Sequence, residues 1–144
     1  MHINFYQTND ILHKSIAPIL MKILEEKKRA LIFCKNEELM KQIDDGLWSF
    51  SKTKFIPHGT KEDKIKVENQ PILITNKQEN DNNSSYLIML DKAEDDFISK
   101  FEKSFYFFGE ENLQESKNLW RYYKSKSANL NFYKKDQDKW IFVQ

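Results

Sequence analysis

The fold is decided by one stretch of the chain, RALIFCKNEELMKQIDDGLW, residues 29–48. Residues 30–34 are continuously apolar, as expected of a strand that is buried on both faces of a sheet. Asn36 is a suitable helix N-cap, and the acidic Glu37 and Glu38 would complement the positive end of a helix dipole. Apolar residues then recur at helical spacing, at Leu39, Met40, Ile43 and Leu47. The stretch therefore predicts a buried strand followed directly by an amphipathic helix.

The flanking segments continue this alternation of strands and helices. Apolar or alternating runs predict further strands at residues 3–6, 54–58, 71–75, 86–90 and 105–108, with one or two edge strands in 129–143. Helical spacing predicts a helix ahead of residue 30, a short helix at 97–101, and a helix of about 15 residues after Gly109. The charged residues 59–69 and the asparagine-rich residues 77–85 are expected to be loops.

The first helix has two possible starting points. Its apolar residues run from Leu12 to Leu24, but Pro18 interrupts them. Either Ser15 caps the helix and Pro18 lies in its first turn, or a longer helix kinks at Pro18.

Alternating strands and helices favour a mostly parallel sheet that is covered on both faces. We therefore expect an α/β fold, namely a Rossmann-like three-layer α/β/α architecture with a mostly parallel sheet and antiparallel edge strands. A chain of 144 residues, 40% of them hydrophobic, suits one such domain spanning residues 1–144.

The composition argues against several functional classes. The net charge is only +1, whereas a non-specific nucleic-acid binder carries a clear basic excess. No run approaches the length of a membrane helix, and the first residues do not resemble a signal peptide, so a cytoplasmic protein that contacts no membrane is expected. The single cysteine, Cys34, lies in the apolar run and excludes an internal disulfide.

The residues needed for common enzyme chemistry are also missing. The three glycines, Gly46, Gly59 and Gly109, are isolated, so neither of the glycine-rich phosphate-binding loops is present. The histidines are far apart in sequence, and His58, at the expected end of a strand, is more readily a structural residue than a catalytic one. We therefore expect no catalytic residues, no metal site and no cofactor.

The helix around residue 120 carries the most distinctive pattern. Lys117, Arg121 and Lys124 lie at i, i+4 and i+7, so they share one face, and Trp120 and Tyr123 lie beside them. Cations next to large aromatic rings suit a peptide that ends in acidic and aromatic residues, because arginine holds a carboxylate by two parallel hydrogen bonds. The alternative is an amphipathic helix with a solvated lysine face and a tryptophan in the core.

A second aromatic cluster combines Trp48 and Phe50 with the segment Phe55-Ile56-Pro57-His58. These side chains could form an exposed apolar patch for a partner protein, or they could all belong to the core.

These motifs together resemble the chi subunit of bacterial DNA polymerase III, a clamp-loader component. The matching segments run in order along nearly the whole chain: Phe5-Tyr6, Arg29-Ala30-Leu31-Ile32, Leu47-Trp48, Phe55-Ile56-Pro57-His58-Gly59, Pro71-Ile72-Leu73-Ile74, Trp120-Arg121-Tyr122-Tyr123-Lys124 and Trp140. The pair Leu47-Trp48, followed closely by residues 55–58, is the most specific part of the resemblance.

The resemblance implies a non-enzymatic adaptor with a Rossmann-like fold. It implies that Lys117, Trp120, Arg121 and Lys124 bind the acidic C-terminal tail of single-stranded DNA-binding protein, so that DNA is contacted indirectly. It also implies that Trp48 and Phe55, to which we add the neighbouring Phe50, face the psi subunit of the clamp loader or a helicase-like protein at the same surface.

The chain departs from the family pattern at two places. Lys117 stands where the family can carry arginine, so the bidentate grip is lost there and Arg121 would carry more of the binding. Residues 127–129 lack the glycine that often follows the basic helix. Two other functions remain as alternatives: a nucleotide-binding α/β enzyme with His58 near its site, and direct binding of single-stranded nucleic acid through the aromatic side chains around Trp120.

Overall fold

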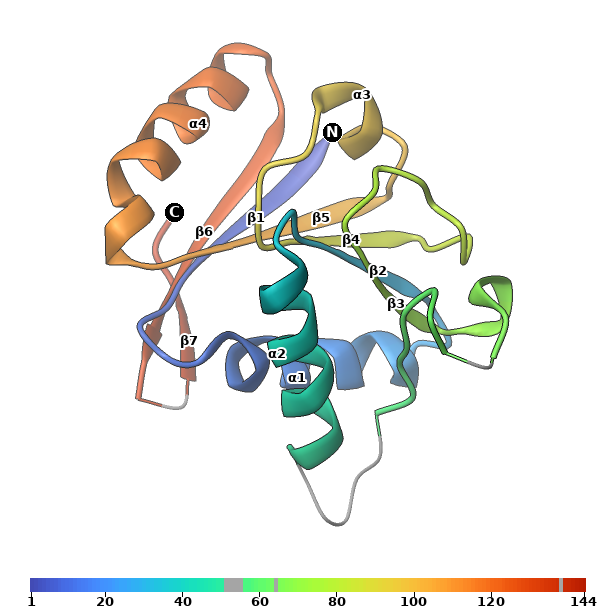
Figure 1. The fold of residues 1–144 in the computed structure, drawn as a ribbon. Coiled ribbons are helices and arrows are strands. Elements are labelled where there is room, and N and C mark those ends of the chain that lie inside the picture. Colours follow the sequence, from blue (N-terminus) through green and yellow to red (C-terminus); the bar gives the residue numbers. More distant parts are fainter. Residues whose placement is uncertain (51–55, 64, 138) are drawn as a thin grey trace.

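The computed structural model describes residues 1–144 except 51–55, 64 and 138. The described strands form one seven-stranded sheet in the order β3-β2-β4-β5-β1-β6-β7 (Figure 1), in which every neighbouring pair is parallel except the antiparallel β6–β7 pair. Their bounds are β1 His2–Gln7, β2 Ala30–Phe33, β3 Ile72–Thr75, β4 Tyr86–Met89, β5 Lys103–Phe108, β6 Asn129–Asp136 and β7 Lys139–Phe142. The expected fold class is confirmed.

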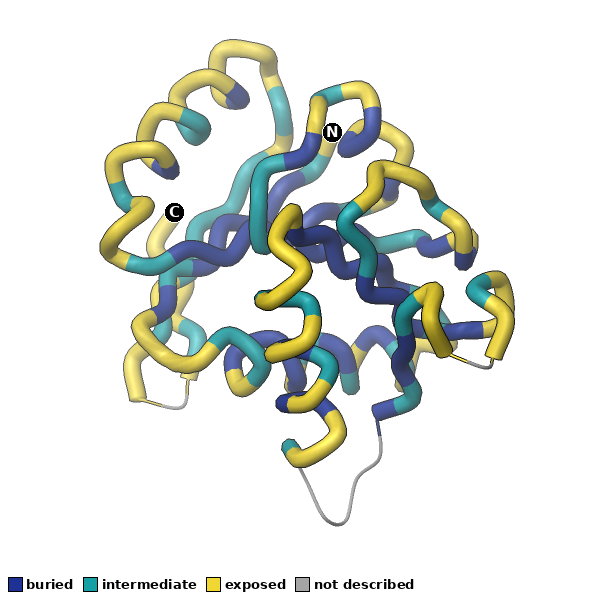
Figure 2. Tube along the Cα trace, in the orientation of Figure 1, coloured by how far each residue is buried: buried dark blue, intermediate teal, exposed yellow. Residues whose placement is uncertain are grey.

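Helices cover both faces of the sheet. They are α1 (Leu12–Glu25), α2 (Glu37–Ser49), α3 (Asp95–Ile98) and α4 (Leu113–Ser125), with short 3₁₀ segments at Val67–Asn69 and Glu110–Asn112. One buried core lies between the sheet and α1 with α2, and a second lies between the sheet and α3 with α4. Figure 2 shows the buried strands between helices that are exposed on their outer sides. None of the helices in the described ranges could cross a membrane.

The stretch at residues 29–48 folds as its pattern predicts. All of β2 is buried, with Ala30 and Ile32 in one core and Leu31 and Phe33 in the other. The side-chain oxygen of Asn36 accepts hydrogen bonds from the backbone N–H groups of Glu38 (2.7 Å) and Leu39 (3.1 Å), which fixes the start of α2.

The alternatives for the first helix are now decided. Helix α1 begins at Leu12 and contains Pro18, so the longer helix forms and Ser15 is not its cap. The Ser15 hydroxyl is instead buried at 2.9 Å from the hydroxyl of Thr8, an interaction between the end of β1 and α1 that the helical pattern does not reveal.

The expected strand at 54–58 is wrong where the structure describes it. Residues 56–58 belong to no strand; Ile56 is buried in the core, and an isolated bridge between Gly59 and Leu73 joins the next residue to the sheet. The backbone oxygen of Ile56, which a strand would use for pairing, lies instead 2.7 Å from Nδ1 of the His58 ring. Residues 54 and 55 lie outside the described residues.

The C-terminal residues form two strands, of which β6 is interior. β6 runs parallel to β1, with Phe5 opposite Phe132 and Tyr6 opposite Tyr133, and β7 forms the sheet edge. Ser127 adopts φ 60° between α4 and β6, the conformation that glycine would supply at lower cost. A serine therefore makes the turn for which the sequence has no glycine.

Candidate peptide-binding groove

Contacts with the neighbouring short helix fix the orientation of α4. Tyr123 is buried, and its hydroxyl donates to Asp95 at 2.7 Å, while the Tyr122 hydroxyl donates to the other carboxylate oxygen at 2.6 Å. Burial alone would raise the pKa of Asp95, but these two hydrogen bonds and the nearby Lys92 hold the pKa below its ordinary value. The carboxylate therefore holds the C-terminal half of α4 against α3.

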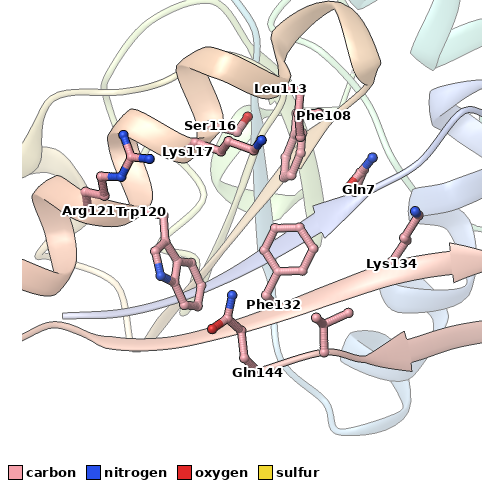
Figure 3. A pocket seen from close by; sticks show the side chains of 11 residues that line it. Gln7, Phe108, Leu113, Ser116, Lys117, Trp120, Arg121, Phe132, Lys134 and Gln144 are labelled. Atoms are coloured by element: carbon pink, nitrogen blue, oxygen red, sulfur yellow. The ribbon is translucent and has the colours of Figure 1, made fainter.

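A groove of about 420 Å³ lies between α4 and the carboxyl ends of strands β1 and β5, with β6 beside them (Figure 3). Its floor is largely aromatic: the ring centroid of Phe132 lies 5.9 Å from that of Trp120 and 5.8 Å from that of Phe108. Trp120 also packs edge-on against Phe5, at 5.2 Å, which anchors its ring to β1. The groove offers a preformed apolar surface of a size suited to one or two side chains of a ligand.

Positive charge surrounds this apolar floor. Lys117 and Arg121 reach it from α4, and Lys134 reaches it from β6. All three side chains are exposed, and within the described part of the chain no ion pair or hydrogen bond of these side chains is found. Unpaired cations around a hydrophobic groove favour a ligand that carries carboxylates next to an apolar side chain.

Three of the four residues predicted for tail binding line the groove together: Lys117, Trp120 and Arg121. Lys124 does not line it, because it lies about 10 Å along the helix axis from Lys117, at roughly 1.5 Å per residue. Tyr123, which the pattern placed beside the cations, faces the core.

The sequence pattern missed the other walls of the groove. Gln7 and Phe108 come from the carboxyl ends of two neighbouring parallel strands, and Phe132, Lys134, Val143 and Gln144 come from β6 and the end of the chain after β7. The carboxyl ends of parallel strands are a recognised place for ligand sites, so β1 and β5 carried a usable signal. No local pattern connects the C-terminal residues with α4.

A second cavity of about 420 Å³ lies beside Trp48. Trp48 is 54% exposed at the end of α2, and Ile65, which lines the same cavity, is 63% exposed. The ring of Trp48 lies 4.8 Å from that of His58. Phe50 is half-buried against the core and lines a different cavity, next to Pro18, and Phe55 lies outside the described residues.

His58 holds the segment beneath Trp48 in place. Its Nδ1 lies 2.7 Å from the backbone oxygen of Ile56, and its Nε2 lies 2.9 Å from Oδ1 of Asp44 and 3.1 Å from the backbone oxygen of Asp44. The imidazole is fully buried, and burial raises the pKa of Asp44, an effect that His58 partly offsets. With both nitrogens engaged inside the protein, His58 serves to join α2 to the following segment.

The edge of the sheet where nucleotides often bind is acidic here. The backbone N–H of Lys35, two residues after the end of β2, donates to the carboxylate of Asp91 at 2.7 Å. The cavity beside the first turn of α2 is lined by Glu37, Asp44, Glu62 and Asp63 against Lys41 and Lys61. Carboxylates in these positions repel phosphate, which disfavours the nucleotide-binding alternative. Among the described residues, no group of three or more histidine, cysteine or acidic side chains could hold a metal ion.

Comparison with known families gives one match that covers most of the chain. The family model described as "DNA polymerase III chi subunit, HolC" matches residues 1–131. The chain belongs to this family. The chi match includes the residues that α4, β1 and β5 contribute to the groove, as well as Trp48 and His58.

A curated chi relative supports the same assignment. "Probable DNA polymerase III subunit chi" from Rickettsia prowazekii (strain Madrid E) is 29% identical to this chain over 86 residues. The aligned part makes up 60% of this chain and 52% of the relative, so the chain spans about half the length of that chi protein.

Proposed function

We propose that this chi-family chain is a non-catalytic adaptor in DNA replication that binds the acidic C-terminal tail of single-stranded DNA-binding protein in the groove of α4. Membership of a family of DNA polymerase III subunits supports an accessory role in replication. The observation that carries the proposal is a set of three exposed cations, Lys117, Arg121 and Lys134, around an aromatic floor; none of them forms an ion pair with another described residue.

The chemistry of the groove matches such a tail. The floor of Phe108, Trp120 and Phe132 accepts the phenylalanine near the end of the tail by edge-on ring contacts. Arg121 presents a planar fork of donors that suits a carboxylate, and Lys117 adds a point charge one turn earlier on the helix.

Weak single contacts suffice for this role. A short groove of this kind would give a dissociation constant on the order of 1 μM, or about −8 kcal/mol. Because a coated single strand displays many tails, the effective concentration of tails is high, and avidity holds the adaptor there without direct contact to DNA.

The first test compares two cations of α4. Arg121→Ala should weaken binding of a fluorescent tail peptide roughly 10- to 30-fold in an anisotropy titration, because it removes a paired charge and leaves the tail carboxylate without that partner. Lys124→Ala, a control on the same helix, should change the affinity by roughly twofold or less, since Lys124 does not line the groove. Equal affinities of the wild type and the Arg121 variant would refute the assignment of the groove.

We also propose that the surface around Trp48, with Phe55 and Phe50, docks the psi subunit of the clamp loader, and that a helicase-like protein could use the same surface. The exposed Trp48 and Ile65 beside an apolar cavity support this proposal, because tryptophan is enriched among residues that dominate binding energy. Trp48→Ala should weaken psi binding roughly 30-fold or more in isothermal titration calorimetry and leave tail binding unchanged. Wild-type affinity for psi in this variant would contradict the proposal.

A further inference from the structure

Part of the groove wall that faces α4 is built by residues beyond the matched family region. The chi match ends at residue 131, whereas Phe132, Lys134, Val143 and Gln144 line the groove. Four of the eleven residues that line the cavity therefore lie in β6 or after β7, in the part of the chain that the family match does not cover.

This wall is held in place by backbone hydrogen bonds. The N–H of Phe132 donates to the backbone oxygen of Gln144 at 2.6 Å, and the N–H of Val143 donates to the oxygen of Phe132 at 2.8 Å. β6 is itself paired with the whole of β1, from His2 opposite Asn129 to Gln7 opposite Lys134. The hairpin is thus a continuation of the sheet, and the fold itself fixes the backbone that carries this wall.

Two adjacent lysines of β6 have different surroundings. Lys135 forms an ion pair with Asp10 at 3.3 Å and lies over the ring of Trp140, so its charge is used within the fold. Lys134 points to the other face of the sheet, as successive strand residues do, and lines the groove; its side chain forms no ion pair among the described residues. Figure 3 shows Lys134 on the side of the aromatic floor away from Arg121.

We infer that the β6–β7 hairpin is a second binding wall in this chain and that Lys134 is a peptide-binding residue. Lys134 contacts a carboxylate on the side opposite Lys117 and Arg121, so the groove selects a peptide with acidic groups on both sides of its apolar anchor. Val143 completes the apolar contact from the hairpin side. This inference rests on the proposed binding of an acidic tail, and it names the determinants of specificity within that site.

The test uses two charge reversals on the same hairpin. Lys134→Glu and Lys139→Glu change the net charge equally, but Lys139, an exposed residue of β7, does not line the groove. In an anisotropy titration with the tail peptide, Lys134→Glu should weaken binding roughly 10-fold or more, and Lys139→Glu should weaken it by roughly twofold or less. Circular dichroism melting of both variants checks that the hairpin remains folded.

A neutral variant gives a readout that a purely structural role would not produce. Lys134→Gln should reduce the dependence of tail affinity on salt concentration, because one fewer charge pair is screened. A peptide in which the acidic residue upstream of the aromatic anchor is replaced by its amide should lose affinity for the wild type and lose much less for Lys134→Gln.

Arg121→Ala separates failure of this inference from failure of the proposed function. If Arg121→Ala weakens binding while Lys134→Glu behaves like Lys139→Glu, the second wall is wrong and the tail site on α4 stands. If neither Arg121→Ala nor Lys134→Glu changes the affinity, the proposed function itself is wrong. Weakening by both Arg121→Ala and Lys134→Glu, with Lys139→Glu unchanged, supports the second wall.

Discussion

The α4 groove and the Trp48 surface differ in the chemistry that they offer a partner. The groove surrounds an aromatic floor with exposed cations, whereas the cavity beside Trp48 is lined by apolar and uncharged side chains together with Asp63. Helices α2 and α4 lie on opposite faces of the sheet (Figure 1), so the two surfaces could be occupied at the same time. One small sheet thus separates a site suited to an anionic peptide from one suited to an apolar protein surface, which is the arrangement that an adaptor needs.

Replacing Trp120 or Trp48 by alanine, one at a time, should give the largest difference in stability and in tail binding between the two surfaces. Trp120 packs against Phe5 and Phe132, so Trp120→Ala should lower the free energy of unfolding by about 2–3 kcal/mol and abolish tail binding. Trp48 is 54% exposed, so Trp48→Ala should cost about 1 kcal/mol or less and leave the tail affinity intact. Urea unfolding followed by circular dichroism measures both. Equal destabilisation by the two changes would remove the distinction between the surfaces.

The salt dependence of binding affinity should also differ between the two surfaces, by a smaller factor. Raising the salt concentration from about 50 to 500 mM should weaken tail binding roughly 5- to 10-fold, because the cations of the groove are exposed and therefore screened. Binding of psi at the apolar Trp48 surface should change by roughly twofold or less over the same range. Anisotropy titrations at several salt concentrations test this, and a salt-independent tail affinity would mean that the cations do not contact the ligand.

The smallest expected effect is on stability and concerns Asp95, which holds α4 against α3. The folded-state pKa of Asp95 is lowered, so the folded protein binds fewer protons at this carboxylate than the unfolded chain does. The ionised carboxylate therefore stabilises the fold above about pH 4, and this contribution is lost as the pH falls through the folded-state pKa. Asp95→Asn should lower the free energy of unfolding by about 1 kcal/mol at pH 7, a value discounted for the partial exposure of the carboxylate.

The difference between Asp95→Asn and wild type should shrink as the pH is lowered toward 3.5, when urea unfolding is repeated across that range. Asp96→Asn is a matched control, because Asp96 is adjacent and its side chain makes no hydrogen bond to a tyrosine within the described structure. A pH-independent penalty for Asp95→Asn would show that the charge is not what stabilises α4.

Most of the sheet follows from the sequence because its parallel strands are short apolar runs between helical repeats. The local pattern also finds the Asn36 cap, since the backbone N–H groups that donate to its side chain lie within three residues of it. The interior position of β6 does not follow, because the partly polar pattern of residues 129–136 is equally typical of an edge strand. Its pairing with β1 connects residues that are more than 120 positions apart.

The candidate site was predictable only on one side. The i, i+4 spacing brings Lys117 and Arg121 to one face, but the same reasoning includes Lys124, because it ignores where along the helix the groove ends. Helical spacing also does not tell that Tyr123 turns inward to Asp95. Lys134 was missed because the charge of a strand residue points to a binding site only when it is known which face of the sheet its side chain occupies. Arg29, the other arginine, donates to the backbone oxygens of Glu68 and Asn82 and so fastens loops.

The central claim is that an acidic tail lies between α4 and the β6–β7 hairpin, and mapping by nuclear magnetic resonance tests it most directly. The ¹⁵N-labelled chain is titrated with the tail peptide while backbone amide and tryptophan indole signals are followed. Saturable shifts should be largest for the Trp120 indole and for the amides of Arg121, Phe132 and Val143, with the Trp48 indole unmoved. Shifts centred on Trp48 and Ile65, or no saturable shift at either wall of the groove, would contradict the account.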